Sequence, residues 1–353
     1  MGRIIVNLLS EFEILDRVKA DWSSPSVTFL CTTYNQKDYV GQTIESFLVQ
    51  KTSFPYQILI HDDKSTDGTK EVIEGYRLKY PNIIKCIYQD ENKYSQGISP
   101  ILIAAKESDG DYIALCEGDD YWINEDKIEN QFNLMMSDKS ISMVVAPGER
   151  LRDGELLSDL HCYYGPNEKS VTAQDILNVP GMFAPTHSYM VKKSYLINAE
   201  EAFIGAPVSD TFIELYCAVF GKFVYSPEVG SVYRLAAKNS WSETMASNKI
   251  DNQLKFIASM RQTIEKSRKI KGFEDLDWSV KLSAMYYTLA LYYLKEKEFN
   301  SFSKAIEKSY NYAFIFKQQK MLFYLKDHMH LIYDSFYPVL LLRRKLKVVL
   351  KRS

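Results

Sequence analysis

The chain has 353 residues, of which 46% are hydrophobic and 25% charged, and its net charge is -2. This length allows one large α/β domain with an appendage, or two domains. The near-neutral charge lacks the basic excess typical of nucleic-acid-binding proteins, so we expect no nucleic-acid partner. The five cysteines lack CxxC spacing, which predicts reduced thiols rather than disulfides or a zinc site.

Targeting and membrane signals are weak. The apolar run at residues 4–9 is too short for a secretory signal, and charged residues follow at once. No segment approaches the ~18 apolar residues of a membrane span. We therefore expect a cytoplasmic protein that is not integral to a membrane, with residues 4–22 forming a short helical lead-in.

Short apolar runs alternate with amphipathic segments along the first half of the chain. Runs with the composition of buried strands occupy residues 27–31, 57–60, 82–88, 112–116, 141–145 and 185–191. Helical spacing occupies residues 39–50, 71–76, 98–107, 124–136 and 212–220. This order predicts an α/β fold, a Rossmann-like and mostly parallel sheet flanked by helices.

Three of the predicted strands end in polar or acidic residues, which are Thr33, Tyr34 and Asn35, then Asp62 and Asp63, and finally Glu117, Asp119 and Asp120. Carboxyl ends of parallel strands meet at one sheet edge, so these side chains are expected to line one crevice. Clustered carboxylates suit Mg²⁺ or Mn²⁺ on a phosphate, although a solvated acidic turn is the alternative for the last group. For Asp62 and Asp63 the alternative is a helix N-terminal turn.

The segments CTTYNQ (31–36), IHDDKSTDGT (60–69) and CEGDDYW (116–122), in this order and spacing, resemble the family 2 glycosyltransferases of GT-A fold. The resemblance covers about the first 245 residues. It implies a catalytic domain over 1–245, followed by a helical C-terminal region over 246–353. The activity that it implies is inverting transfer of a sugar from a nucleoside diphosphate sugar.

The resemblance also assigns roles to the strand-end residues. Thr33, Tyr34 and Asn35 would line the nucleotide pocket. Asp62 would contact the base or ribose, with Asp63 beside it. Glu117 and Asp119 occupy the family's DxD position and would bind the divalent cation, Mg²⁺ or Mn²⁺, that holds the diphosphate. Asp120 would lie at the sugar or beside the metal.

Two later positions complete the implied site. Asp210 precedes a predicted helix, where its chemistry fits a helix cap, and the resemblance assigns it as the base that deprotonates the acceptor hydroxyl. The segment VYRLAAKNSWS (232–242) resembles a family segment through Tyr233, Arg234, Trp241 and Ser242. Ala236 stands where the family has His, so Lys238 is expected, with Arg234, to supply positive charge to the nucleotide sugar.

Trp122 and Trp241 are candidates for stacking on the sugar or acceptor, with packing in the core or at its rim as the alternative. Beyond residue 248 the pattern is helical, with amphipathic segments at 254–264, 280–294 and 299–312. Residues 336–352 join an apolar run to six lysines and arginines. This tail predicts peripheral contact with anionic membrane, and the alternatives are a solvated tail or a partner contact.

The sequence therefore predicts a glycosyltransferase that uses a UDP-sugar and acts on a hydroxyl of a growing glycan in bacterial surface polysaccharide biosynthesis, with a lipid-linked glycan as one candidate acceptor. Its expected location is the cytoplasm, at the inner face of the cell membrane. Two alternatives stay open. One is a catalytically silent scaffold that binds nucleotide or membrane. The other is a sugar nucleotidyltransferase, which would need a Gly-rich basic loop that CTTYNQKDY lacks.

Overall fold

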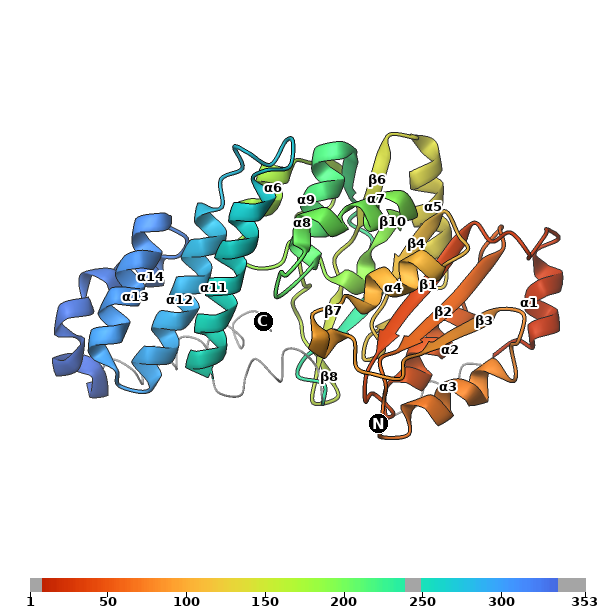
Figure 1. Ribbon diagram of the computed structural model, residues 1–353, viewed down its shortest axis with the longest axis horizontal. Coiled ribbons are helices and arrows are strands. Elements are labelled where there is room, and N and C mark those ends of the chain that lie inside the picture. Colours follow the sequence, from red (N-terminus) through yellow and green to blue (C-terminus); the bar gives the residue numbers. More distant parts are fainter. Residues whose placement is uncertain (1–7, 239–248, 336–353) are drawn as a thin grey trace. The chain divides into compact units, whose positions relative to one another are not determined.

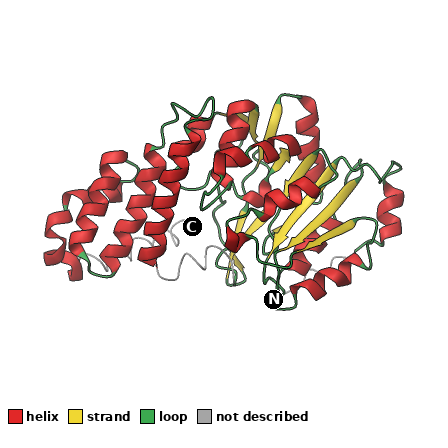
Figure 2. Ribbon diagram, viewed as in Figure 1, coloured by secondary structure: helices red, strands yellow, loops and turns green. Residues whose placement is uncertain are grey.

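The computed structural model describes residues 8–238 and 249–335, and the chain divides into two compact units. The first unit comprises residues 1–173 and 184–244, and it is an α/β domain (Figures 1 and 2). The second unit comprises residues 174–183 and 245–353, and its described part is helical. Residues 174–183, which the sequence pattern did not separate from the first unit, thus belong to the second.

The first unit is built on an eight-stranded sheet. Across the sheet the strands follow the order β3 (Ile84–Tyr88), β2 (Tyr56–Asp62), β1 (Val27–Thr33), β4 (Tyr112–Leu115), β10 (Met190–Lys192), β6 (Ile141–Val145), β11 (Lys222–Tyr225) and β9 (Lys169–Val171). Strands β3, β2, β1 and β4 pair in parallel, whereas β10 is antiparallel to both of its neighbours. The prediction of a mostly parallel sheet flanked by helices is confirmed.

The helices and short turns of the first unit are α1 (Glu11–Arg17), α2 (Val40–Leu48), α3 (Thr69–Arg77), η1 (Tyr94–Gln96), α4 (Pro100–Glu107), α5 (Lys127–Ser137), η2 (Thr186–Ser188), α7 (Lys193–Asn198), α8 (Glu200–Phe203) and α9 (Asp210–Phe220). Their starts follow local chemistry. Helix α4 begins after Ser99, whose hydroxyl accepts a hydrogen bond from the Leu102 N–H, and Pro100 fits the first turn. Helix α3 begins after Gly68, whose φ of +99° is readily available to glycine.

Register places the carboxyl ends of the central strands side by side. Thr33 pairs with Asp62 at the ends of β1 and β2. Beyond the last residue of β4, the main chain continues the ladder, because Cys116 N donates to Leu30 O at 3.1 Å and Gly118 N donates to Thr32 O at 3.0 Å. The segment after β4 is therefore held against the end of β1.

Aromatic side chains fill the core beneath this edge. Phe29 stacks on Tyr56 with ring centroids 4.4 Å apart, and Trp122 packs against Phe47 at 4.4 Å and Phe29 at 5.3 Å. The Trp122 indole N–H donates to the His187 carbonyl at 2.9 Å, so its one polar atom is satisfied. Trp122 is 3% exposed and belongs to the core, so the structure favours the packing alternative and we assign it no sugar contact.

A second sheet of four short strands has the order β5 (Tyr121–Trp122), β12 (Ser231–Arg234), β7 (Glu149–Arg152) and β8 (Glu155–Leu156). Strand β5 follows the acidic segment after β4, and Trp122 pairs with Ser231 of β12. This pairing brings Arg234, at the end of β12, to residues more than a hundred positions earlier in the chain.

The segment predicted as a strand over 185–191 is only partly one. Residues Thr186–Ser188 form the turn η2, closed by Ser188 N and Ser188 Oγ, which both donate to Pro185 O. Strand β10 starts only at Met190. The reason is that the Pro185 carbonyl closes a tight turn here instead of pairing in the ladder, and this turn carries Thr186 and His187 toward the strand-end segment.

The second unit contains α6 (Ala173–Leu177), α11 (Lys249–Ser267), α12 (Ser279–Lys295), α13 (Phe299–Tyr312), α14 (Lys317–Tyr324) and η3 (Lys326–His328). A separate apolar core includes Tyr286, Phe302 and Leu322. The predicted helical C-terminal appendage is confirmed. Within the described ranges, none of the helices combines the length and apolarity needed to cross a membrane. The predicted membrane-binding tail, 336–352, lies outside the described residues.

Candidate active site

The acidic loop, which we define as residues 117–120, lies at the end of β1. Asp119 and Asp120 are buried, and Glu117 is half-buried. Thr43 of α2 anchors the loop, because its hydroxyl lies 3.0 Å from Gly118 O and 2.7 Å from Asp120 O. A Cβ on Gly118 would lie 2.6 Å from Gln36 Oε1 and 2.7 Å from Thr33 Oγ1, so only glycine fits at this position.

Burial perturbs all three carboxyls of the acidic loop. Burial, together with the charge of Asp119, raises the pKa of Glu117 to about 7. Burial likewise raises the pKa of Asp119 above its ordinary value and that of Asp120 well above it. Perturbed carboxyls gathered at a strand end are typical of a binding or catalytic site.

Only one of the two carboxylate oxygens of Glu117 has a hydrogen-bond partner among the described residues. Its Oε1 accepts a hydrogen bond from the Thr186 hydroxyl of η2. Its Oε2 is buried and has no hydrogen-bond partner among the described residues. Over residues 8–238 and 249–335, no three His, Cys, Asp or Glu side chains are gathered as a complete metal site. A cation here would therefore need further oxygen ligands, as Mg²⁺ commonly takes from water and substrate phosphates.

Arg234 closes over the acidic loop from β12. Its Nε donates to Asp119 O at 2.8 Å, and its main-chain N–H donates to Asp120 Oδ1 at 2.7 Å. Its guanidinium lies between the rings of Tyr39 and Tyr121, at 4.8 and 5.3 Å from their centroids. Such stacking and forked donation suit arginine and not lysine. Arg234, which was predicted from the sequence to contact the nucleotide sugar, thus holds the acidic loop in position.

Ala236 and Lys238, two later residues of the segment that contains Arg234, are exposed. Lys238 is exposed, and its main-chain N–H lies 3.5 Å from the Tyr39 hydroxyl. Ala236, where the family has His, is exposed with a φ of +56°, in the left-handed region. The predicted contact Trp241 and its neighbour Ser242 lie outside the described residues.

The turn after β1 is joined to the turn after β2. Asn35 has a φ of +53°, its main-chain N–H donates to Ser65 Oγ at 2.8 Å, and its Oδ1 accepts from Thr66 N at 2.8 Å. Thr33 is buried and donates to Gln36 Oε1 at 2.8 Å. Tyr34 is 41% exposed, so its ring is accessible to a ligand at this edge.

Asp62 and Asp63 are both buried and both hold loops at the sheet edge. Asp62 accepts hydrogen bonds from the Ser65 N–H and hydroxyl, and burial raises its pKa. Asp63 accepts from Lys93 N at 2.8 Å and Tyr94 N at 3.0 Å, which fixes the turn η1. Helix α3 begins at Thr69, whose N–H donates to Asp67. Asp62 and Asp63 therefore lie before the N-terminal turn of α3, which was the alternative interpretation of these two acids.

Asp210 is the first residue of α9, with its Oδ1 2.7 Å from the adjacent Thr211 N. The helix cap itself is Ser209, so Asp210 occupies the first turn, where a carboxylate complements the helix dipole. Its negative charge is among the causes that raise the pKa of Glu117, and that of Tyr189 as well. Asp210 is thus electrostatically coupled to the acidic loop from a separate element.

Sequence reasoning missed the buried partners of this loop. His187 is fully buried, its Nδ1 lies 2.7 Å from Ser231 Oγ, and its Nε2 lies 3.9 Å from Asp120 Oδ2. Thr186 contacts Glu117 from the same turn. The only sequence signal was a Pro-Thr-His-Ser run within an apolar segment. His61, interpreted from the sequence as structural, is buried with its Nε2 3.1 Å from Gln89 Nε2.

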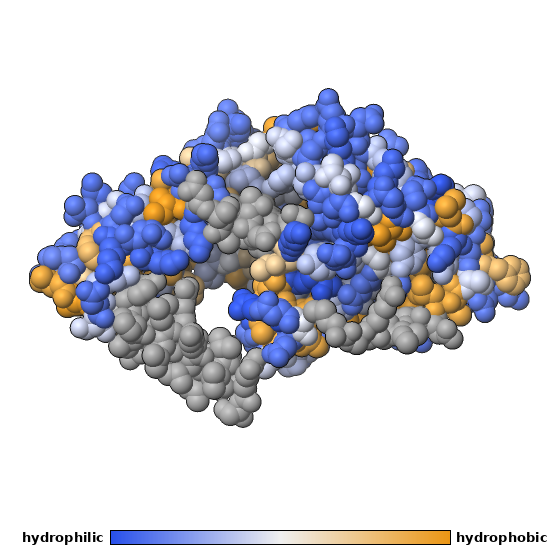
Figure 3. Space-filling model, turned by 90° about the horizontal axis from the view of Figure 1, so that it is seen from below, coloured by the Kyte–Doolittle hydropathy of each residue, from blue (hydrophilic) through white to orange (hydrophobic). Residues whose placement is uncertain are grey.

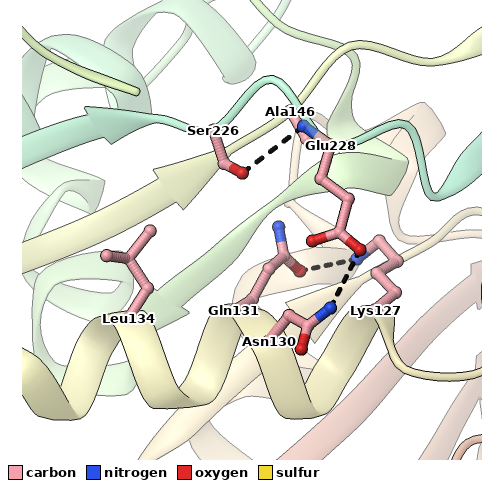
Figure 4. Close-up of a pocket in the computed structure, with 7 residues that line it drawn as sticks. All are labelled: Lys127, Asn130, Gln131, Leu134, Ala146, Ser226 and Glu228. Carbon is pink, nitrogen blue, oxygen red and sulfur yellow. Dashed lines mark hydrogen bonds between the residues drawn. The ribbon is translucent and has the colours of Figure 1, made fainter. Parts of the chain in front are cut away.

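A small cavity of about 30 Å³ lies apart from these residues, against α5 (Figure 4). It is lined by Lys127, Asn130, Gln131, Leu134, Ala146, Ser226 and Glu228. The Lys127 amine is buried, donates to Gln131 Oε1 at 2.7 Å and lies 4.5 Å from the Trp122 ring centroid. The volume is enough for about one water molecule, which excludes a sugar nucleotide.

The fold and the acidic strand ends together define a class of protein. The structure resembles that of Staphylococcus aureus TarS, residues 1–349, in complex with UDP-GlcNAc, with a TM-score of 0.55 and 16% identity over 80% of this chain and 81% of that one. It also resembles a mannosyltransferase from Pyrobaculum calidifontis in complex with GDP-Man and Mn²⁺, with a TM-score of 0.53 and 13% identity over 90% and 91%. The fold is GT-A.

Residues 28–196, just under half of the chain, match the model of glycosyl transferase family 2, and this part of the chain is of that family. An uncharacterised protein of Mycobacterium tuberculosis is 29% identical over 61% of this chain. A putative teichuronic acid biosynthesis glycosyltransferase of Bacillus subtilis is 35% identical over 32% of the chain. A UDP-Glc:alpha-D-GlcNAc-diphosphoundecaprenol beta-1,3-glucosyltransferase of Escherichia coli is 39% identical, also over 32%. The chain spans 60% of the length of the first relative and 42% of the other two.

Proposed function

We propose that this protein is an inverting glycosyltransferase that moves a sugar from a nucleoside diphosphate donor, a UDP-sugar, to a hydroxyl of a growing glycan. The observation that carries the proposal is the acidic loop, held at the end of the sheet by Thr43 and Arg234, with Asp210 at the start of α9 among the charges that act on Glu117. A base on one element and carboxylates for the donor on another are what a single displacement requires.

In the proposed reaction, Asp210 accepts the proton of the acceptor hydroxyl while that oxygen attacks the anomeric carbon. The bond between this carbon and the diphosphate oxygen breaks, and its electron pair leaves with the nucleoside diphosphate. Attack from the opposite side inverts the anomeric configuration. Asp210 is half-buried and accepts a hydrogen bond from Thr211 N, which keeps its carboxylate at the start of α9.

We assign Asp119 and Glu117 as the residues that would hold Mg²⁺ or Mn²⁺. Three adjacent carboxyls whose pKa values burial raises, together with the buried and unpartnered Glu117 Oε2, fit a cation with oxygen ligands. When bound, the ion would neutralise charge on the leaving diphosphate. Asp120 is assigned to the inner side of the loop, where Arg234 N and His187 surround it.

We assign Lys238, which is exposed beside Tyr39, as the residue that supplies positive charge to the nucleotide-sugar donor. The Arg234 guanidinium already contacts Asp119 O and Gln42 Oε1, the latter at 2.9 Å. We therefore propose that Arg234 acts mainly as a positioning residue, which holds the acidic loop against the donor.

The nucleotide is assigned to the turns after β1 and β2. Thr33, Tyr34 and Asn35 would line its pocket, and the exposed Tyr34 ring is accessible for stacking on the base. Asp62 would contact the base or ribose by exchanging its hydrogen bonds with Ser65, and Asp63 would act through the turn η1 that it fixes.

The acceptor is proposed to be lipid-linked and part of a bacterial surface polysaccharide. The Escherichia coli relative is named for a diphosphoundecaprenol-linked acceptor and the Bacillus subtilis relative for teichuronic acid biosynthesis, and both support this proposal. A peripheral position at the inner face of the cell membrane would bring the site to such an acceptor, with the tail at 336–352 as one contact.

Turnover of a panel of UDP-sugars and GDP-sugars, with and without a glycan acceptor, tests this function. The purified wild-type chain should release nucleoside diphosphate from one donor class. Asp210→Asn should bind that donor with unchanged affinity but lower kcat by about 10² to 10⁴-fold, the range for loss of a general base.

The matched control is Asp111→Asn, at the exposed opposite end of the same strand that leads to the acidic loop. It should leave kcat unchanged. If the wild type and Asp111→Asn both bind the donor but turn it over with none of the acceptors, the silent scaffold is favoured instead. Formation of a nucleoside diphosphate sugar from a sugar 1-phosphate and a nucleoside triphosphate, with release of pyrophosphate from the triphosphate, would favour a nucleotidyltransferase.

A further inference from the structure

A basic and aromatic segment in the second unit stands apart from the proposed active site. Residues 308–326 contain four lysines, six aromatic residues and no Asp or Glu. The segment covers the end of α13, the connection 313–316 and helix α14. Figure 1 draws α13 and α14 in blue within the second unit, and Figure 3 shows hydrophobic residues in orange exposed among hydrophilic ones on this unit.

One side of α14 presents aromatic and basic side chains together. Lys320 and Tyr324 are spaced four residues apart, which places them on one side of α14. Phe316 is the N-cap residue directly before the helix, and Lys317 is the first residue of the helix. Phe316 is 42% exposed, Tyr324 is 66% exposed, and Phe314 in the preceding connection is 58% exposed. We call these five residues the α14 face.

The opposite side of α14 is fixed by a buried polar network. Gln319 is fully buried, and its Nε2 lies 2.8 Å from Ser309 Oγ and 2.9 Å from Ala313 O. Its Oε1 accepts from Ile315 N at 2.8 Å. Leu322 is also buried. Because this side is anchored, the α14 face stays directed to solvent, and its aromatic rings need no rearrangement to meet a partner.

The charges on the α14 face are available for a partner. Lys326 lies 3.3 Å from Asp327 and 3.8 Å from Glu307, so its charge is offset. Lys317 and Lys320 are exposed and form no ion pair within the described part of the chain. Lysines interleaved with exposed aromatic residues, with no acidic residue between them, are typical of a surface that binds anionic lipid. In such a contact the rings enter the headgroup region and the lysines contact phosphates.

We propose that the α14 face is a docking surface for anionic membrane, separate from the tail at 336–352. The helical unit then has a folded membrane contact of its own, which does not depend on the glycosyl-transfer activity. Phe314, Phe316 and Tyr324 supply the apolar insertion, and Lys317 and Lys320 supply the electrostatic attraction.

Co-sedimentation of the full chain with vesicles tests this surface. Phosphatidylcholine vesicles should bind weakly, and vesicles that also contain phosphatidylglycerol should bind the wild type in a salt-sensitive manner. Lys317→Gln with Lys320→Gln should lower the partition coefficient by about 25-fold, at about fivefold per lysine. Phe314→Ser with Phe316→Ser should lower it by about tenfold, because buried ring area is lost.

The control is Lys266→Gln with Lys269→Gln, two exposed lysines on and just beyond α11 in the same unit. It removes the same charge and should leave binding unchanged, and circular dichroism should show all variants folded. Wild-type-like binding by both α14-face variants would overturn the proposal and assign binding to the tail. Equal loss in the α11 control would also overturn it. So would self-association, without vesicle binding, that the α14-face variants abolish.

Discussion

The main-chain N–H of Arg234 donates to Asp120 Oδ1 at 2.7 Å, and the Arg234 Nε donates to Asp119 O at 2.8 Å. One residue of the small sheet therefore holds two consecutive residues of the acidic loop. The guanidinium cannot swing out freely, because Tyr39 and Tyr121 lie on it at 4.8 and 5.3 Å. The geometry of the proposed donor site thus depends on a residue on β12.

Replacing Arg234 with Lys keeps the charge but removes the forked donation and most of the ring stacking. We expect kcat for sugar-nucleotide turnover to fall by about 10 to 100-fold, since misplaced carboxylates weaken catalysis strongly. The Mn²⁺ concentration for half-maximal activity should rise. Steady-state kinetics with a Mn²⁺ titration measure both effects.

Arg152→Lys, on an exposed residue of the same small sheet, is the matched control and should change neither quantity. If thermal stability falls in proportion to kcat in Arg234→Lys, without any shift in the Mn²⁺ requirement, then Arg234 serves packing alone.

Replacing Gly118 with Ala should destabilise the first unit. The added Cβ would meet Gln36 Oε1 at 2.6 Å and Thr33 Oγ1 at 2.7 Å. Overpacking of this kind costs about 1–3 kcal/mol of unfolding free energy. Denaturant unfolding provides the measurement. Gly75→Ala is the control, because nothing lies within 4 Å of its added Cβ on α3, and there alanine should stabilise by about 0.5–1 kcal/mol. Equal responses of the two variants would contradict the close approach at Gly118.

Lys127 should make stability depend on pH. Burial lowers its pKa from an ordinary value of 10.5 to about 7. Between these values the unfolded chain binds more protons than the folded chain, so the free energy of unfolding rises with pH across this window. Below about pH 7 both states are protonated, and the cost of burying the charge is fully present. The slope is up to about 1.4 kcal/mol per pH unit.

Lys127→Met should flatten this slope, as measured by urea unfolding at several values between pH 7 and pH 10. Lys19→Met, on an exposed lysine, should keep the wild-type slope. If Lys127→Met also retains the wild-type slope, the buried amine does not titrate in this window.

Much of the fold and site was predictable from local patterns. Strands β1, β2 and β4 are short apolar runs that end in polar residues, and both features are visible within a few positions of Thr33, Asp62 and Glu117. Parallel pairing then places those ends at one edge, as the register Thr33 to Asp62 confirms. Asp210 was found only through family resemblance, because the cap chemistry alone fits a structural role equally well.

The rest of the site depends on contacts distant in sequence. Thr186 and His187 lie in a turn next to the antiparallel strand β10, and Arg234 lies on β12. No periodicity in the local sequence could therefore predict that they contact residues 117–120. Trp122 lies two residues beyond Asp120, but the alternation of a short strand directs its ring into the core. Sequence spacing could not decide between that core position and a place on the sugar.

Calorimetric titration of UDP and GDP into the intact chain, with and without Mn²⁺, tests whether the acidic loop binds the donor through a cation. We expect that UDP binds, that Mn²⁺ strengthens the binding, and that Asp119→Ala removes the metal dependence, while Asp111→Asn binds as the wild type does. UDP binding that is indifferent to Mn²⁺ and to Asp119→Ala would contradict the proposed role of the acidic loop. The leaving diphosphate would then have to be stabilised by side chains such as Lys238.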